Sequence, residues 1–178
     1  MAVSERLARA SRIMSWFSAA GTVLVPAGTV FCFLAPHLAR MLGADLDHHG
    51  LSHLTLAVPL ADRAIALLFA LIPAGIATFG LAMLTRLLRL FARGKVFGAD
   101  SLHALGLITA ALFWNVVAAF VMEAPISWFL TRWQPHAELQ LTIMSDDIQI
   151  LFLAGVAWVV ARVLAEARRL ADENASFV

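Results

Sequence analysis

The fold is decided by residues 64–84, AIALLFALIPAGIATFGLAML, which contain no charged side chain. At about 1.5 Å per residue, a helix of this length spans about 30 Å, the thickness of the hydrocarbon core of a bilayer. The run lacks the strict alternation of a membrane barrel strand. Lipid offers the backbone no hydrogen-bond partners, and a helix closes its backbone bonds within one segment. The stretch therefore predicts a transmembrane helix.

Three further apolar runs have a similar length, at residues 13–35, 104–122 and 148–165. The chain is 61% hydrophobic and 14% charged, with a mean hydropathy of +0.84, so it has too few polar residues to cover a soluble domain. We therefore predict an all-α fold, an integral membrane four-helix bundle that forms a single domain over residues 1–178. Its helices are expected at about 13–35, 64–92, 101–122 and 148–172. The first run is longer than the apolar region of a signal peptide, so we expect an uncleaved helix.

Basic residues follow the second run directly, in RLLRLFARGKVFGAD at residues 86–100. Together with the N-terminal tail and the part of the fourth helix beyond its centre, this segment holds ten of the thirteen cations of the chain. Cations concentrate on the cytoplasmic side of membrane proteins. The sequence therefore predicts cytoplasmic N and C termini and a cytoplasmic turn between the second and third helices. Gly94 is expected to end the second helix, and Asp100 or Ser101 to cap the third.

Small residues recur every four positions along the second helix and favour close helix packing, which matters in lipid because apolar burial gives little drive for association. This stripe comprises Ala66, Ala70, Ala74, Thr78 and Ala82. It indicates a contact with the fourth helix or, equally, with a second copy in a homo-oligomer. Asn115, near the middle of the third helix, is expected to hydrogen-bond across a helix interface. Pro26 and Pro73 are expected to shape the packing of their helices.

The outward connector at residues 43–53, GADLDHHGLSH, gathers His48, His49 and His53. Imidazole groups bind transition metals and titrate near neutral pH, so an extracytoplasmic metal or pH sensor is one interpretation. A solvated polar loop is the other, because the spacing matches no metal motif. Asp62 and Glu123 are expected near the outer interface, where their charges reach water.

No catalytic or cofactor motif is visible in the sequence. It has no nucleophile elbow and no glycine-rich phosphate loop. We therefore expect a protein that is not an enzyme and has no cofactor. The formal net charge of +1 gives no reason to expect direct nucleic acid binding.

The segment LLRLFARGKVFGADSLHALGLI, residues 87–108, resembles the central signature of the domain of unknown function 2975 family, small bacterial four-helix membrane proteins. The matching positions are Phe91, Gly94, Lys95, Phe97, Leu102 and Gly106. Residues 141–178 are similar to the last helix and acidic tail of the family, although the chain ends in ASFV where the family commonly has LTV. The resemblance implies a multi-pass protein of the bacterial inner membrane, and it supplies no catalytic residue.

Members of this family are often encoded beside a small helix-turn-helix transcription regulator, so the resemblance implies a membrane partner or tether for such a protein. The candidate contact residues lie in the basic turn and are Arg93, Gly94, Lys95, Phe97 and Asp100. Topology setting and attraction to anionic lipid explain the same cations without a protein partner. A small transporter or channel component built on the proline-containing helices is a further alternative.

The topology can be measured with reporter tags. A tag inserted at residue 95 and a tag at the C terminus are both expected to report from the cytoplasm, because the cations hold these segments on that side. Alkaline phosphatase and green fluorescent protein fusions at the two positions measure this. A tag at residue 95 that reports from outside the cell would overturn the predicted orientation.

Overall fold

The computed structural model describes residues 2–43, 51, 54–55, 57–94, 98–133 and 145–175, and all regular structure in these ranges is helical. The five helices are α1 (Ala2–Leu34), α2 (Pro36–Met41), α3 (Leu60–Ala92), α4 (Ala99–Thr131) and α5 (Ser145–Ala175). Four of them are long and apolar enough to cross a membrane, as expected for a multi-pass membrane protein. The short helix α2 was not predicted from the sequence.

The long helices extend further than the sequence indicated. At about 1.5 Å per residue, the 33 residues of α3 and of α4 each reach about 50 Å, well beyond the hydrocarbon core. The prediction ended the third helix at residue 122, but α4 continues through Glu123 and Pro125 to Thr131. The prediction followed the apolar run, which ends at residue 122, whereas the later residues keep an apolar face, with Ile126 and Leu130, that packs in the core.

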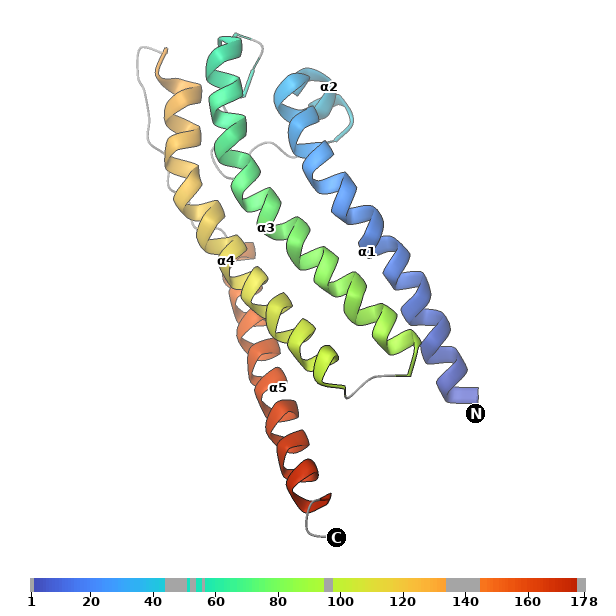
Figure 1. Cartoon of the computed structure of the whole chain (residues 1–178). Coiled ribbons are helices and arrows are strands. Elements are labelled where there is room, and N and C mark those ends of the chain that lie inside the picture. Colours follow the sequence, from blue (N-terminus) through green and yellow to red (C-terminus); the bar gives the residue numbers. More distant parts are fainter. Residues whose placement is uncertain are drawn as a thin grey trace.

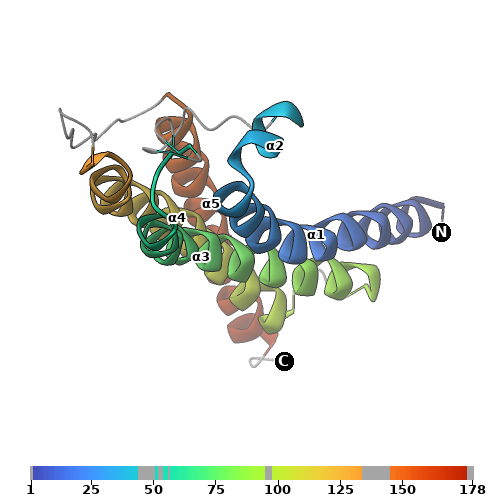
Figure 2. The same cartoon turned by 90° about the horizontal axis from the view of Figure 1, so that it is seen from above.

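The four long helices stand in an open row in the order α1, α3, α4, α5 (Figure 1). Within the described residues, α1 packs on α3, α3 on α4, and α5 on α4, while α5 makes no contact with α1 or α3. Figure 2 shows the row from above, with α2 set to the side of α1. The arrangement differs from a bundle in which every helix has two neighbours, and the expected pairing of the second and fourth helices is wrong.

Both termini and the α3–α4 turn lie at one end of the row, which we call the basic end (Figure 1). Exposed guanidinium groups gather there from the start of α1 and the last turns of α3, and they belong to Arg9, Arg12, Arg86, Arg89 and Arg93. The opposite end, which we call the capped end, is closed by α2 and the described parts of the connector before α3. An even number of membrane crossings explains why the two termini share an end.

The hydrophobic core lies at the capped end. It joins Phe33 of α1, Ala66 and Ala70 of α3, Ile126 and Leu130 of α4, and Leu54 and Val58 of the connector. Leu54 is fully buried, so the connector folds back over the helix ends. Elsewhere most large apolar side chains are exposed, and only 6% of the apolar segment of α5 is buried. Such an exterior is suited to lipid as the surrounding solvent.

Small residues bring α3 close to both of its neighbours. A Cβ atom added to Gly80 would lie 3.2 Å from the Cβ of Ala111 on α4, and one added to Gly21 of α1 would lie 3.1 Å from Leu81 of α3. The hydroxyl of Ser18 on α1 donates a 2.9 Å hydrogen bond to the carbonyl of Leu81. Close backbone approach and hydrogen bonds of this kind are the main sources of helix association in lipid.

Replacing Gly80 with leucine is expected to destabilise the protein, because the new side chain must displace α4. The expected loss in the free energy of unfolding is about 1–3 kcal/mol, as for other overpacked positions. Gly75→Leu is the matched control, since a Cβ at Gly75 meets no atom within 4 Å and the same gain in helix propensity applies. Circular dichroism of thermal unfolding in detergent measures both. Equal midpoints for the two variants would contradict the close approach of α3 and α4.

Candidate functional site

The basic turn begins with a helix stop that positions Arg93. α3 ends at Ala92, and the N–H groups of Arg93 and Gly94 donate to the carbonyls of Leu90 and Phe91 at 3.1 and 2.9 Å. Gly94 has a φ of 77°, in the left-handed region that a residue with a Cβ adopts at a cost. Glycine at this position is a common end to a helix. Arg93 is exposed beside this stop.

The other predicted contact residues flank the turn. Lys95 and Phe97 lie outside the described residues. Asp100 is exposed in the first turn of α4, but the residue that precedes this helix is Gly98, and neither Asp100 nor Ser101 caps it. The negative charge of Asp100 still lies near the partial positive charge of the helix N-terminus, and this attraction stabilises the helix. Arg93 and Asp100 are thus exposed on the two sides of the turn.

The predicted metal ligands cannot be placed. His48, His49 and His53 lie outside the described residues. Among the residues that are described, no three histidine, cysteine, aspartate or glutamate side chains gather around a common point. The metal or pH sensor therefore stays a prediction from the sequence.

The predicted packing residues lie along α3 and α4. Ala66, Ala70 and Ala74 are buried, Thr78 and Ala82 are half-buried, and Asn115 of α4 is half-buried opposite α3. Asn115 donates a 2.8 Å hydrogen bond from its side-chain amide to the carbonyl of Pro73 on α3. This contact joins the two helices at the proline, and such bonds contribute about 1 kcal/mol in membranes.

A cluster of buried polar residues at the capped end was missed by the sequence analysis. Asp62, in the first turn of α3, forms an ion pair with Arg132 and accepts a hydrogen bond from the indole of Trp133, both directly after α4. The guanidinium of Arg132 also lies over the rings of Phe129 and Trp133, with distances of 5.1 and 5.3 Å to the ring centroids. These contacts link the start of α3 to the end of α4.

The two acids of this cluster do not reach water as expected. Asp62 and Glu123 are each only 1% exposed, and Ser127 and Thr131 beside them on α4 are fully buried. The hydroxyl of Thr131 donates to the carbonyl of Ser127 at 2.8 Å. The expectation failed because α4 continues past Glu123, which keeps Glu123 inside a packed helix and brings Arg132 and Trp133 onto Asp62. The sequence held a signal for this contact, which was Asp62 at the start of one span and the Arg132–Trp133 pair directly after the next span.

The buried ion pair of Asp62 has a clear energetic consequence. Removing a carboxylate from water costs several kcal/mol, and hydrogen bonds to a paired cation offset that cost. The side chain of Arg132 is 37% exposed, so the pair lies at the edge of the packed region. The arrangement ties the first turn of α3 to the residues that follow α4.

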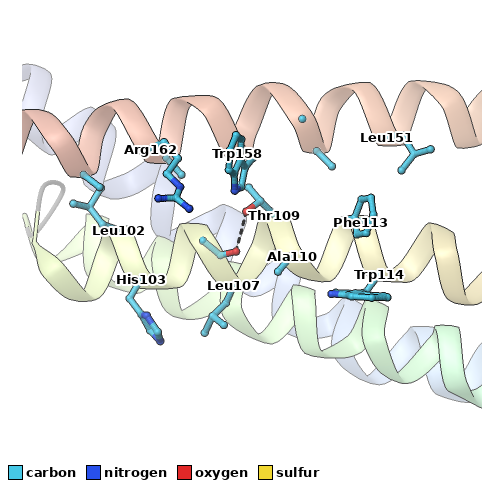
Figure 3. Close-up of a pocket in the computed structure, with 15 residues that line it drawn as sticks. Leu102, His103, Leu107, Thr109, Ala110, Phe113, Trp114, Leu151, Trp158 and Arg162 are labelled. Atoms are coloured by element: carbon cyan, nitrogen blue, oxygen red, sulfur yellow. Dashed lines mark hydrogen bonds between the residues drawn. The ribbon is translucent and has the colours of Figure 1, made fainter.

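A groove of about 870 Å³ runs between α4 and α5 (Figure 3). Trp158 and Arg162 of α5 point toward α4, and Phe113 of α4 points toward α5. The guanidinium carbon of Arg162 lies 5.2 Å from the centroid of the Trp158 ring. The remaining wall is mostly small or apolar and includes Gly106 and Gly155. This volume falls within the range of about 300–1,000 Å³ found for small-molecule sites.

Breaking the ion pair is expected to destabilise the capped end. Asp62→Ala removes the carboxylate that Arg132 and the Trp133 indole bind and should lower the free energy of unfolding by about 1–3 kcal/mol, because the guanidinium left behind is 37% exposed and water replaces part of the lost bond. The double variant Asp62→Ala with Arg132→Gln should recover part of the loss, because no uncompensated cation is left. Asp100→Ala, at the exposed acid of the α4 first turn, is the control and should shift stability by less than about 0.5 kcal/mol. Thermal unfolding in detergent reports all three, and an Asp62→Ala midpoint equal to that of Asp100→Ala would contradict the burial of the pair.

Comparison with known proteins places the chain in a family without assigning it an activity. A search of curated proteins and a search of solved structures each returned no match. The family described as Protein of unknown function (DUF2975) matches residues 45–178, which include the basic turn, the α4–α5 groove and the buried polar cluster. The match begins after α1, so it confirms the resemblance over the signature and the last helix. Because the match covers more than half of the chain, the protein belongs to the DUF2975 family.

Proposed function

We propose that this protein is a non-catalytic membrane protein that holds a cytosolic partner at its basic end. The partner is the helix-turn-helix regulator that the family resemblance implies. The observation that carries the proposal is the gathering of the N terminus, the α3–α4 turn and the C terminus at one end of the row (Figure 1). A cytosolic protein that met this end would contact three separate segments of the chain at once.

The turn supports this proposal through its geometry. Gly94 in its left-handed conformation ends α3 sharply and leaves Arg93 exposed, so the guanidinium is presented on a defined backbone. Guanidinium groups form bidentate bonds to carboxylates. An acidic surface on the regulator is therefore the chemistry that fits. The proposed location is the bacterial inner membrane, with the basic end in the cytoplasm.

The packing of the row gives less support to a transporter. Transport requires a hydrated path, whereas the α1–α3 and α3–α4 interfaces are closed by small residues around Gly21 and Gly80. Asn115 lies at the second of these interfaces with its amide bonded to the Pro73 carbonyl. The described interfaces therefore favour a tether over a transport pathway.

The test alters the turn while leaving every cation in place. Gly94→Ala forces a Cβ into the left-handed conformation at a cost of about 1–2 kcal/mol, so the turn should rearrange and retain several-fold less of the adjacent regulator on copurification. Gly94→Asn is the matched control, because asparagine tolerates this conformation and should retain the regulator. Phe97→Ala tests the second signature position. Unchanged copurification with both Gly94→Ala and Phe97→Ala, at equal amounts in the membrane, would count against the tether and leave lipid attraction as the role of the cations.

A further inference from the structure

We infer that the groove between α4 and α5 is a binding site for an anionic phospholipid, whose phosphate lies at Arg162 and whose acyl chain lies along the groove. This goes beyond the proposed tether, because it concerns a different surface and a different ligand. The groove is lined by two membrane-spanning helices, so lipid is the molecule that meets it first. Figure 3 shows its walls.

Charge complementarity selects an anionic headgroup. Arg162 is the one residue with a full charge among the fifteen that line the groove, and no acid is among them. Glu166, one turn further along α5, is 3.5 Å from Arg169. Among the side chains that the structure describes, no carboxylate lies within ion-pair distance of Arg162. A guanidinium binds phosphate through two parallel hydrogen bonds, and basic pockets between membrane helices bind anionic headgroups.

The depth of Arg162 matches a headgroup. It lies inside the apolar segment Ile148–Ala167 of α5, five residues before its end, and this end of α5 extends toward the basic end of the row (Figure 1). A charge within a span is costly unless it reaches the interface or an anion. The guanidinium is already held over the Trp158 ring, which fixes its direction into the groove. Its long stem lets the charge reach from there toward the phosphates of that leaflet.

The length and shape of the groove match an acyl chain. On α4 it runs from Leu102 to Trp114, which is about 18 Å along a helix and close to the thickness of one leaflet, about 15 Å. A Cβ added to Gly106 or to Gly155 would meet no atom within 4 Å, so these two glycines leave the groove open. Phe113 and Trp158 supply flat apolar walls. A second copy of the chain is the competing occupant, but its acid at the level of this arginine, Glu166, lies 3.5 Å from Arg169, whereas a phospholipid offers Arg162 an anion with no cation of its own chain beside it.

The headgroup is tested on the purified full-length protein by native mass spectrometry during titration with phosphatidylglycerol or phosphatidylcholine. The parent should bind phosphatidylglycerol about fivefold more tightly, the ratio that corresponds to about 1 kcal/mol for one basic residue. Arg162→Gln should bring the ratio close to one, and Arg162→Lys should keep part of it. Arg169→Gln is the matched control and should keep the full ratio. Equal affinities in the parent, or equal losses in Arg162→Gln and Arg169→Gln, would overturn the inference.

The acyl chain is tested by filling the groove without touching Arg162. Gly155→Leu should weaken phosphatidylglycerol binding several-fold, whereas Gly28→Leu, at an equally open glycine of α1, should leave it unchanged. Glycerol phosphate without acyl chains should not compete. If it competes as well as the lipid, the site binds a soluble anion and the inference fails. A dimer that excludes both lipids would also overturn it, in favour of a second copy. None of these outcomes depends on whether the regulator binds the basic turn.

Discussion

The structure depends on one constraint, which is that lipid gives helices little reason to associate by burying apolar surface. Close approach and hydrogen bonds must replace the hydrophobic effect. The α1–α3 interface shows how this is achieved, because Ser11, Ser15 and Ser18 are buried at helical spacing on α1. Ser18 and Thr85 both donate to the carbonyl of Leu81 at 2.9 Å. A hydroxyl that donates to a backbone carbonyl has its hydrogen-bonding capacity satisfied within the protein, so it can be buried where the two helices are in contact.

The capped end is packed differently from the rest of the row. The core around Phe33 and Leu54 resembles that of a water-soluble protein, with large apolar side chains enclosed on all sides. The pair of Asp62 and Arg132 lies beside it and ties the start of α3 to the residue after α4. A buried pair of this kind is weak as a source of stability but specific in geometry. Together with the Asn115–Pro73 hydrogen bond and the close approach of Gly80 and Ala111, it favours one register for α3 and α4.

The spans and the basic turn could be predicted from the sequence because they depend on local composition. A run of about 20 apolar residues predicts a span, and a glycine after a basic helix end predicts a helix stop, without information from any other segment. The neighbour of α5 could not be predicted in this way. Ala66, Ala70 and Ala74 mark a packing face on α3, and Ala154 is buried on α5. A stripe of small residues shows that a helix packs there, but it does not indicate which helix. The burial of Asp62 was hidden for a related reason, because it depends on how far α4 continues after Glu123.

The open row gives α4 a special position, because it is the helix that belongs to all three candidate regions. Its first turn borders the basic turn at Asp100, its middle forms one wall of the groove at Phe113, and its end lies beside the ion pair at Arg132. Within the described residues α5 reaches the rest of the molecule only through α4. Coupling between two regions requires an element whose arrangement both of them bias. A helix that packs along one side can change its tilt with fewer broken contacts than a helix that packs along both sides. The groove lies between α4 and α5, so a ligand there would bias the tilt of α5 and would displace most the end of α5 that extends toward the basic end.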